Sequence, residues 1–322
     1  MLNHLSQNST LAGRTLLRTS LAAAMLFPLA HPALAAHSFG KALPNGTRFQ
    51  QARLTAANPA AMFRKQWAHR STKNGGHFHF PYGLAADALG NVFVANSQSN
   101  TVAMISPKLK ATDGVITQQL NGPASVAVGA DQTIFVGNLG VSGGYVERYS
   151  GSTPQQTITA NAAAPYDIAA DQFNDLYVVY NGGIALDDPS GNSLYGPEYQ
   201  SYGIFSVAVG NANVYGFVNN DVLMGSGSVF LRSGMLQSIF GPTNAAEPVG
   251  AACGNGMCWF SDAGKDTINI LATNAISTGI LNYSPAGVAY DRLHNRIFVA
   301  DPQNNAVHIY NAQTLALEKN IT

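Results

Sequence analysis

The sequence predicts an all-β fold in which six four-stranded antiparallel sheets, or blades, stand around a central axis. Two observations predict it. Short β-branched and aromatic runs alternate with polar turns along most of the chain, which is typical of many short strands. A motif of small apolar residues, opened in most copies by a proline, recurs every 37 to 44 residues, at Pro81, Pro123, Pro165, Ile204, Pro248 and Pro285. A period near forty with several strands per unit is typical of a β-propeller.

The composition supports a folded chain without a nucleic-acid partner. Of 322 residues, 46% are hydrophobic and only 11% are charged, which is too apolar for a disordered chain. Lys plus Arg and Asp plus Glu both total 17, so the formal net charge is zero. Because no basic excess exists to hold a phosphate backbone, we expect no binding to nucleic acid.

The N-terminal residues carry the features of an export signal. Arg14 and Arg18 precede an apolar run at residues 21–30, and Ala33-Leu34-Ala35 supplies the small residues of a cleavage site. The apolar run is too short to span a bilayer. We therefore expect residues 1–36 to be a signal peptide, the protein to be secreted or periplasmic, and no integral membrane segment to remain after cleavage.

The mature chain divides into an extension and the repeat region. Residues 37–80 are about one blade long but lack the proline motif, so they are expected to form an N-terminal extension. A degenerate seventh blade is the alternative for this segment. Residues 81–322 are expected to form the propeller.

Each unit of the repeat follows one order of strands. A short run such as Leu84-Ala85-Ala86 has side chains small enough for an innermost strand, where the blades crowd around the axis. A polar turn and an alternating run such as Val92-Phe93-Val94 follow, and these larger residues suit packing between blades. Third strands are predicted at residues 102–105, 145–149, 229–231, 268–271 and 307–310, with none placed in the third unit, and a weaker fourth strand completes the blade. The last unit keeps its own fourth strand, residues 315–321, so we expect the ring to close by side-chain packing, helped by the extension.

The units resemble the NHL-repeat family of β-propellers. Pro285-Ala-Gly-Val-Ala-Tyr-Asp291 followed by Asn295-Arg-Ile-Phe-Val-Ala-Asp301 is the strongest match, and the unit that begins at Pro81 is similar. The resemblance covers roughly residues 81–322 and is weakest in the fourth unit, which has Ile204 in place of the proline. It implies a propeller of antiparallel four-stranded blades and, by analogy with the fold, an interaction platform.

The two cysteines are predicted to form a disulfide. Cys253 and Cys258 flank the turn between the first two strands of the fifth unit, and facing residues of a hairpin lie within disulfide reach. An exported protein meets an oxidising compartment. The alternative, a redox pair or a soft-metal site, is less favoured because no histidine lies nearby in the sequence.

Polar residues recur where the second strand of each unit ends. We expect them to bond free backbone N–H groups, because repetition in nearly every blade is typical of a structural role. The residues are Asn96, Asn138, Asp262 and Asp301, with Asn181 and Asn219 displaced by one position.

Candidate site residues are therefore the exceptions to the repeat. Asp167 stands where the other units have Gly or Ser, at the start of an innermost strand and near the mouth of the central channel. Its carboxylate is expected either to bind a cation or act as a base, or else to bond local N–H groups or face solvent. His77 and His79 lie just before the first unit, where strand alternation would put both imidazoles on one face. Two histidines make an incomplete metal site, and a solvated pair is the alternative.

Other residues around the same anchors complete the candidate set. Glu247 is a further carboxylate before an innermost strand, and three tyrosines, Tyr82, Tyr166 and Tyr202, recur at equivalent places. Their rings either floor a shallow pocket or pack as core. The acidic stretch at residues 187–192 lacks the complete spacing of a calcium loop and is expected to be a hairpin tip.

Two functions remain open. The first is a non-catalytic exported propeller that binds a protein, peptide or glycan, with no cofactor; the lack of a convergent acid/base set favours it. The second resembles propeller lactonases and lyases, which hold a divalent metal at the channel mouth. Asp167, Asn121, Asn282 and Glu247 are its candidates for such a metal, but they match no motif of those enzymes, and the opening Glu of the gluconolactonase pattern is not found. The sequence favours the non-enzymatic function.

Overall fold

The computed structural model describes residues 76–140, 143–158, 164–180, 183–198, 204–209, 214–218, 227–230, 236–240, 247–272 and 275–322. All of them belong to one compact unit, residues 55–322. The predicted signal peptide, residues 1–36, and most of the predicted extension lie outside the described residues. Within the described ranges, no helix is both long enough and apolar enough to cross a membrane.

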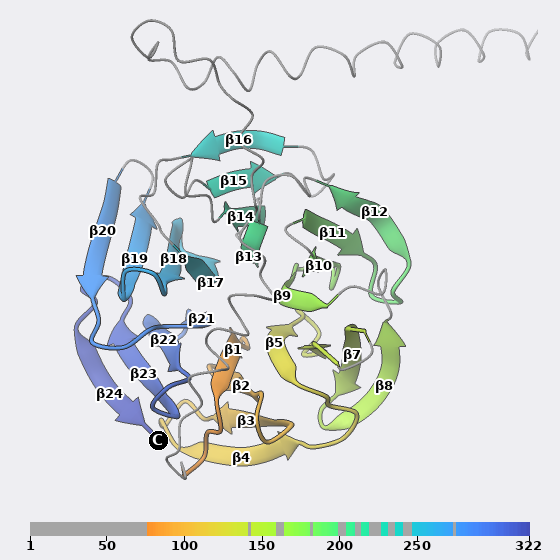
Figure 1. The fold of residues 1–322 in the computed structure, drawn as a ribbon, viewed down its shortest axis with the longest axis horizontal. Helices are drawn as coiled ribbons and strands as arrows, with labels where there is room; N and C mark the ends of the chain where they lie inside the picture. Colours follow the sequence, from red (N-terminus) through yellow and green to blue (C-terminus); the bar gives the residue numbers. More distant parts are fainter. Residues whose placement is uncertain are drawn as a thin grey trace, which may run out of the picture. The chain divides into compact units, whose positions relative to one another are not determined.

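The described residues form six antiparallel sheets, each made of four consecutive strands (Figure 1). The first three sheets contain β1 (Pro81–Ala86), β2 (Val92–Asn96), β3 (Thr101–Ile105) and β4 (Ala111–Ile116); β5 (Pro123–Val128), β6 (Ile134–Asn138), β7 (Tyr145–Ser150) and β8 (Thr153–Ile158); and β9 (Pro165–Ala170), β10 (Leu176–Tyr180), β11 (Gly183–Asp187) and β12 (Ser193–Glu198).

The remaining sheets follow in the same order. They contain β13 (Ile204–Val209), β14 (Val214–Val218), β15 (Gly227–Phe230) and β16 (Leu236–Phe240); β17 (Pro248–Gly254), β18 (Met257–Asp262), β19 (Thr267–Ala272) and β20 (Ala275–Ile280); and β21 (Val288–Asp291), β22 (Arg296–Asp301), β23 (Ala306–Asn311) and β24 (Leu317–Ile321).

The innermost strands arrange these sheets as a propeller. In chain order, β1, β5, β9, β13, β17 and β21 each contact the next, and β21 contacts β1 (Figure 1). A four-stranded sheet with two apolar faces cannot bury both by itself, so each sheet is covered by its neighbours.

The predicted count of six blades, with seven as the alternative, is corrected by the structure. Five blades are described by their strands and their side chains. The fourth sheet, β13–β16, is described by its backbone pairing. Its sequence departs most from the repeat, with Ile204 in place of the anchor proline and a Gly/Ser-rich stretch at residues 225–228. Glycine has low strand propensity, so the sequence of this unit favours strands less than the sequences of the other units do.

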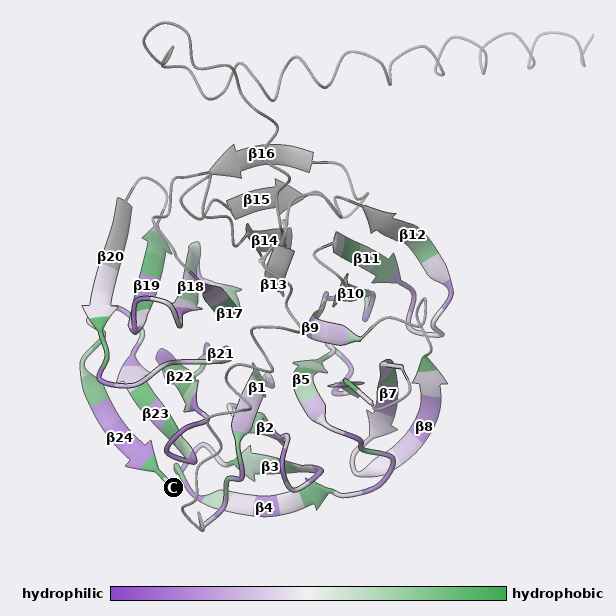
Figure 2. Cartoon of the chain, in the orientation of Figure 1, coloured by the Kyte–Doolittle hydropathy of each residue, from purple (hydrophilic) through white to green (hydrophobic). Residues whose placement is uncertain are grey.

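The hydrophobic core is divided among the interfaces between neighbouring blades. Phe135 and Val146 of the second blade pack with Ile168 of the third, and all are nearly inaccessible to solvent. Trp259 of the fifth blade is fully buried, stacks on Tyr290 of the sixth at 4.3 Å between ring centroids, and donates from Nε1 to the carbonyl oxygen of Ala312. Figure 2 shows the outer strands β8 and β24 with more hydrophilic residues than β3 or β19. Much of the buried apolar surface therefore lies between neighbouring blades.

The ring closes without exchange of a strand between the first and last blades. As predicted, β24 pairs with β23 in its own sheet. Closure depends on contacts between side chains and backbone: Phe78 and Phe80 are fully buried in the core shared by the first and sixth blades, and the backbone N–H of Phe80 donates to Oδ1 of Asn305 at 2.9 Å. The part of the extension that the structure describes thus contributes two aromatic side chains to the seam.

Candidate functional site

A cavity of about 160 Å³ lies along the axis of the propeller, between the innermost strands. One end is formed where these strands begin, with Tyr82, Tyr166 and Asp167, and we call it the channel mouth. The other end is formed where they finish, with Cys253 and Tyr290. Most of the wall between the two ends consists of Gly, Ala, Val, Leu and Ile. The small side chains predicted for the innermost strands therefore leave a narrow apolar channel.

Asp167 connects the third blade to the fourth sheet. Oδ2 accepts hydrogen bonds from Oγ of Ser206 at 2.6 Å and from the backbone N–H of Val207 at 3.0 Å. Oδ1 accepts one from the backbone N–H of Ile168 at 3.0 Å. Of the two predicted roles, bonding to nearby N–H groups is present, and the side chain also lines the cavity.

Burial favours the neutral carboxylic acid form of Asp167 over the charged carboxylate. The surrounding protein raises the pKa of Asp167 from 3.8 to about 7, because desolvation outweighs the opposite effect of its three hydrogen bonds. Near neutral pH the side chain therefore exchanges between the neutral and the charged form. This is the range that suits a general acid, a general base or a pH-dependent ligand-binding group.

The equivalent position in other blades explains why Asp167 is unusual. At Gly83, Gly250 and Gly287, an added Cβ would come within 2.5 Å of backbone atoms of the adjacent blade. At Gly287 the backbone N–H donates directly to the carbonyl oxygen of Tyr82 at 2.8 Å. Glycine permits this close approach, whereas at the third blade a carboxyl group spans the gap between the strands.

Tyr82, Tyr166 and Glu247 are near Asp167 at the channel mouth. Burial raises the pKa of Tyr82 well above its usual value, and the nearby Asp167, Tyr166 and Glu247 add to the increase. Tyr82 is 9% exposed, and its ring stacks on that of Phe80. Glu247 is half-buried, and its backbone N–H donates to Oδ1 of Asp262. The structure thus places three of the predicted residues, Tyr82, Tyr166 and Asp167, at one end of the channel, with Glu247 close to Tyr82.

His77 and His79 are not part of this cavity. His77 is exposed, and its carbonyl oxygen accepts a hydrogen bond from Nδ2 of Asn96. His79 is half-buried, and its backbone N–H donates to Oδ1 of Asn96. The alternation predicted for this segment is present, since Phe78 and Phe80 are both buried. Tyr202 lies outside the described residues.

The structure shows no metal centre at the residues proposed for one. Among the residues that the structure describes, no group of three or more His, Cys, Asp or Glu side chains could hold a metal ion. Asn282 is exposed, and Asn121 donates its backbone N–H to Oδ1 of Asn138 at 2.9 Å. Neither asparagine lines the channel.

The recurring Asn and Asp residues at the ends of the second strands have the predicted structural role. Asn96, Asn138 and Asp262 accept backbone N–H groups from the segment that precedes the first strand of their own blade. Asp301 instead accepts from the backbone and side chain of Asn304 in the following turn. Asn181 and Asn219 lie outside the described residues.

The acidic stretch at residues 187–192 is a hairpin tip, as predicted. It connects β11 to β12. Oδ1 of Asp188 accepts the backbone N–H groups of Ser190 and Asn192, and Oδ2 accepts Nδ2 of Asn192 at 2.7 Å. These bonds occupy the carboxylate within its own turn.

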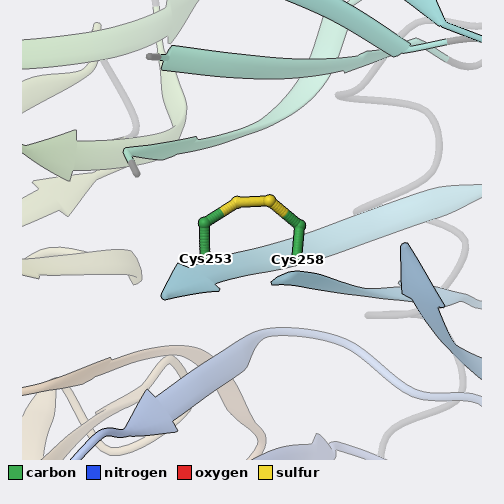
Figure 3. Close-up of a disulfide and its surroundings, with 2 residues drawn as sticks. All are labelled: Cys253 and Cys258. Atoms are coloured by element: carbon green, nitrogen blue, oxygen red, sulfur yellow. A yellow bond between two sulfur atoms is a disulfide. The ribbon is translucent and has the colours of Figure 1, made fainter. Parts of the chain in front are cut away.

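Cys253 and Cys258 form a disulfide, which confirms the predicted pairing (Figure 3). They are direct partners in the register of β17 and β18, with their Cα atoms 4.1 Å apart. The bridge lies at the end of the cavity opposite Asp167. It closes the tip of the hairpin in the fifth blade.

Three exposed apolar residues were not recognised as candidates from the sequence. Leu89, Phe173 and Leu293 are 64%, 53% and 65% exposed, and each lies in the turn between the first and second strands of its blade. In each turn the backbone N–H of this residue donates to Oδ1 of the Asp two positions earlier. The shared pattern Asp-x-Leu or Asp-x-Phe was the signal that could have found them.

These turns lie together at one end of the ring, which we call the hairpin face. Between the second and third blades, Asp131 donates its backbone N–H to Oδ1 of Asn174 at 3.4 Å. Between the fifth and sixth, Nδ2 of Asn255 donates to the hydroxyl of Tyr290 at 2.7 Å. A Cβ on Gly90 would lie 3.1 Å from the ring of His294, so the turns of the first and sixth blades also adjoin.

Comparisons with known proteins support the fold. The chain is similar to virginiamycin B lyase from Staphylococcus aureus, with 16% sequence identity, a TM-score of 0.56, and coverage of 79% of this chain and 86% of that one. It is also similar to hydrazine synthase from Kuenenia stuttgartiensis (13% identity, TM-score 0.57, 78% and 88% covered). A third similar structure is the PQQ-bound aldose sugar dehydrogenase from Streptomyces coelicolor, with 13% identity, a TM-score of 0.52, and coverage of 73% of this chain and 91% of that one. At these identities the likeness establishes the β-propeller fold alone.

The sequence comparisons identify no family. No family model matches the chain. A segment of 51 residues is 45% identical to the PE-PGRS family protein PE_PGRS18 of Mycobacterium tuberculosis, and it covers 16% of this chain and 11% of that protein. The match thus spans about a tenth of the length of this relative. The resemblance to NHL repeats remains a prediction from the motifs.

Proposed function

We propose that this chain is an exported, non-catalytic propeller that binds a protein or peptide on its hairpin face. The observation that carries the proposal is the exposure of Leu89, Phe173 and Leu293 at equivalent positions of three blades. Single exposed apolar residues are common, but repeated exposure on one face is typical of interaction surfaces. Aromatic side chains are enriched at the cores of protein interfaces, which makes Phe173 the strongest anchor of the three.

Two observations support export. The Cys253–Cys258 disulfide is a bond that persists in oxidising compartments. The sequence of residues 1–36 has the features of a cleaved signal. N-terminal sequencing of the mature protein tests this part; a chain that retains residues 1–36 in the cell interior would contradict it.

Photo-crosslinking tests the binding surface. A photoreactive amino acid at position 173 or 293 is expected to form adducts with a partner in the exported fraction. The same group at Leu317, which is 53% exposed but lies on the outer strand β24, is the matched control and is expected to form none of these adducts. The combined substitution Leu89→Ser, Phe173→Ser and Leu293→Ser is expected to reduce recovery of the partner at least tenfold while the fold stays intact. Identical adducts from all positions, or none, would overturn the proposal.

A propeller enzyme is the second candidate function. It is favoured by Asp167, whose position at the channel mouth and pKa of about 7 suit acid/base chemistry, and by the likeness of the fold to a lyase and a dehydrogenase. Metal analysis and a screen for lactone hydrolysis distinguish the two candidates. Bound Ca²⁺ or Zn²⁺, or hydrolysis, that is lost in Asp167→Ala would support the enzyme and count against the non-catalytic function.

A further inference from the structure

The central cavity has an uneven distribution of charge. Among its described lining residues, Asp167 is the only one with a side chain that titrates near neutral pH. The other polar side chains in the wall are the tyrosines and Cys253, which is held in its disulfide. The channel is therefore an apolar tube with one carboxyl group near one end.

The hydrogen bonds of Asp167 leave room for a ligand. A carboxylate has about four positions at which it can accept a hydrogen bond. Three are used, two of them on Oδ2 and one on Oδ1. Oδ1 can therefore accept one more donor, and the cavity is the side from which a donor can approach, because Asp167 lines it.

The residues around Asp167 favour a donor that carries a positive charge. Burial makes an isolated carboxylate costly, and a cation beside it offsets that cost. Tyr82 and Tyr166 line the same end of the channel, and aromatic rings attract cations. Glu247 adds a second carboxyl group close enough to raise the pKa of Tyr82. An anion would meet only unfavourable charge at this end.

The remainder of the channel is suited to an apolar tail. Ala169 lies two residues after Asp167 on β9, so strand alternation places both on the same face. The volume of about 160 Å³ equals roughly five water molecules, and cavities of about this size in other proteins hold a benzene molecule. The space thus fits one small organic group of roughly six carbons or fewer.

We propose that the central channel binds a small alkylammonium ion, with its ammonium group on Asp167 at the channel mouth and its alkyl chain along the apolar wall. This site is separate from the hairpin face, so the proposal does not depend on partner binding at that face.

Calorimetric titration of the full chain with ethyl-, butyl- and hexylammonium at pH 8 tests the proposal. Affinity is expected to rise about fourfold for each added methylene until the channel is filled. Butanol and butyrate, which have the same chain length, are expected to bind at least tenfold more weakly than butylammonium. Equal binding of butanol and butylammonium would overturn the role of charge.

Variants assign the binding to this site. Asp167→Asn is expected to reduce butylammonium affinity at least tenfold, whereas Asp188→Asn, which removes an exposed carboxylate from a hairpin tip outside the channel, is the matched control and should have no effect. Ala169→Leu narrows the tube without altering the carboxyl group. In this variant the affinity is expected not to rise from ethyl- to hexylammonium. This second variant keeps the test decisive if Asp167→Asn fails to fold.

The dependence on pH gives a further readout. An ammonium ion competes with the proton on Asp167. The other titratable groups at this end are Tyr82, whose pKa is raised by burial, Tyr166, and Glu247, which is not part of the cavity wall. Affinity is therefore expected to fall about tenfold for each pH unit below 7. Undetectable binding of all three ammonium ions at millimolar concentration, or affinity unchanged in both channel variants, would overturn the proposal.

Discussion

Two junctions of the ring differ at one position of the repeat. This position is Gly287 where the sixth blade meets the first, and Asp167 where the third blade meets the fourth sheet. At the first junction, Gly287 brings two backbones together and donates directly to Tyr82, while Phe78 and Phe80 fill the seam. At the second, Asp167 reaches across to Ser206 and Val207. Apolar side chains fill the first junction, and the second depends on a carboxyl group that burial makes hard to ionise.

This difference shows how a repeat protein can acquire a site without altering its frame. A position that is glycine for close packing in three blades can carry a side chain where the neighbouring strand offers donors. The same substitution would be excluded at Gly287, because a Cβ there would lie 2.3 Å from the carbonyl oxygen of Tyr82. A departure from the repeat was thus a better guide to the channel mouth than the repeated residues were.

The largest expected effect lies at the apolar junction. Phe80→Ala removes a fully buried ring from the seam and is expected to lower the free energy of unfolding by about 3–5 kcal/mol. Denaturant unfolding measures this change. Phe173→Ala is the matched control, since it deletes the same atoms from a residue that is 53% exposed, and it should change stability by no more than about 0.5 kcal/mol. Similar losses in both variants would mean that Phe80 does not hold the ring closed.

A smaller effect is expected from the glycine contact. Gly287→Ala forces a Cβ against the backbone of the first blade and is expected to cost about 2–3 kcal/mol. Gly151→Ala is the control, because Gly151 has φ +58° and no atom within 4 Å of an added Cβ. It should cost about 1 kcal/mol from backbone conformation alone. Equal costs in thermal or urea unfolding would remove close approach as the reason for glycine at position 287.

The smallest effect, and the one that depends on pH, is expected at Asp167. Because its folded pKa is raised to about 7, its contribution to stability is fully present below the unfolded value near 3.8 and is lost as pH rises through 7. Because Asn cannot ionise, the free energy of unfolding of Asp167→Asn relative to that of the wild type should rise by about 1–2 kcal/mol between pH 5 and pH 8. This is less than the full pKa shift implies, because part of the Asp167 side chain faces the channel. Urea unfolding across this range measures the difference. Parallel curves for the two proteins would show that Asp167 does not titrate there.

Much of the fold could be predicted from the sequence because strands leave a local signal. The anchors placed β1, β5, β9, β13 and β17, and alternating runs placed the second strands within one or two residues. No third strand was predicted for the third unit, where the structure has β11 (Gly183–Asp187), since a short run between glycine and two aspartates carries little alternation. The predicted number of blades was corrected at the fourth unit, whose sequence keeps only part of the pattern.

The candidate site was predicted less completely. Asp167, Tyr82, Tyr166 and Glu247 were selected as exceptions to the repeat, and the first three lie at the channel mouth, with Glu247 close to Tyr82. His77 and His79 were selected by chemistry alone and lie elsewhere, because the buried residues of their segment are Phe78 and Phe80. The apolar residues of the hairpin face were missed, since exposure cannot be recognised from residue type.

The sequence by itself determined the strand order, the period of the repeat and the pairing of Cys253 with Cys258, because each depends on residues close together along the chain. Only the tertiary structure decided which side chain spans a gap between blades, which carboxyl group faces an apolar channel and which leucines stay exposed. Those properties arise where residues from different repeats meet. There, burial and distance, and not residue type, set the energy of a charge or an apolar surface.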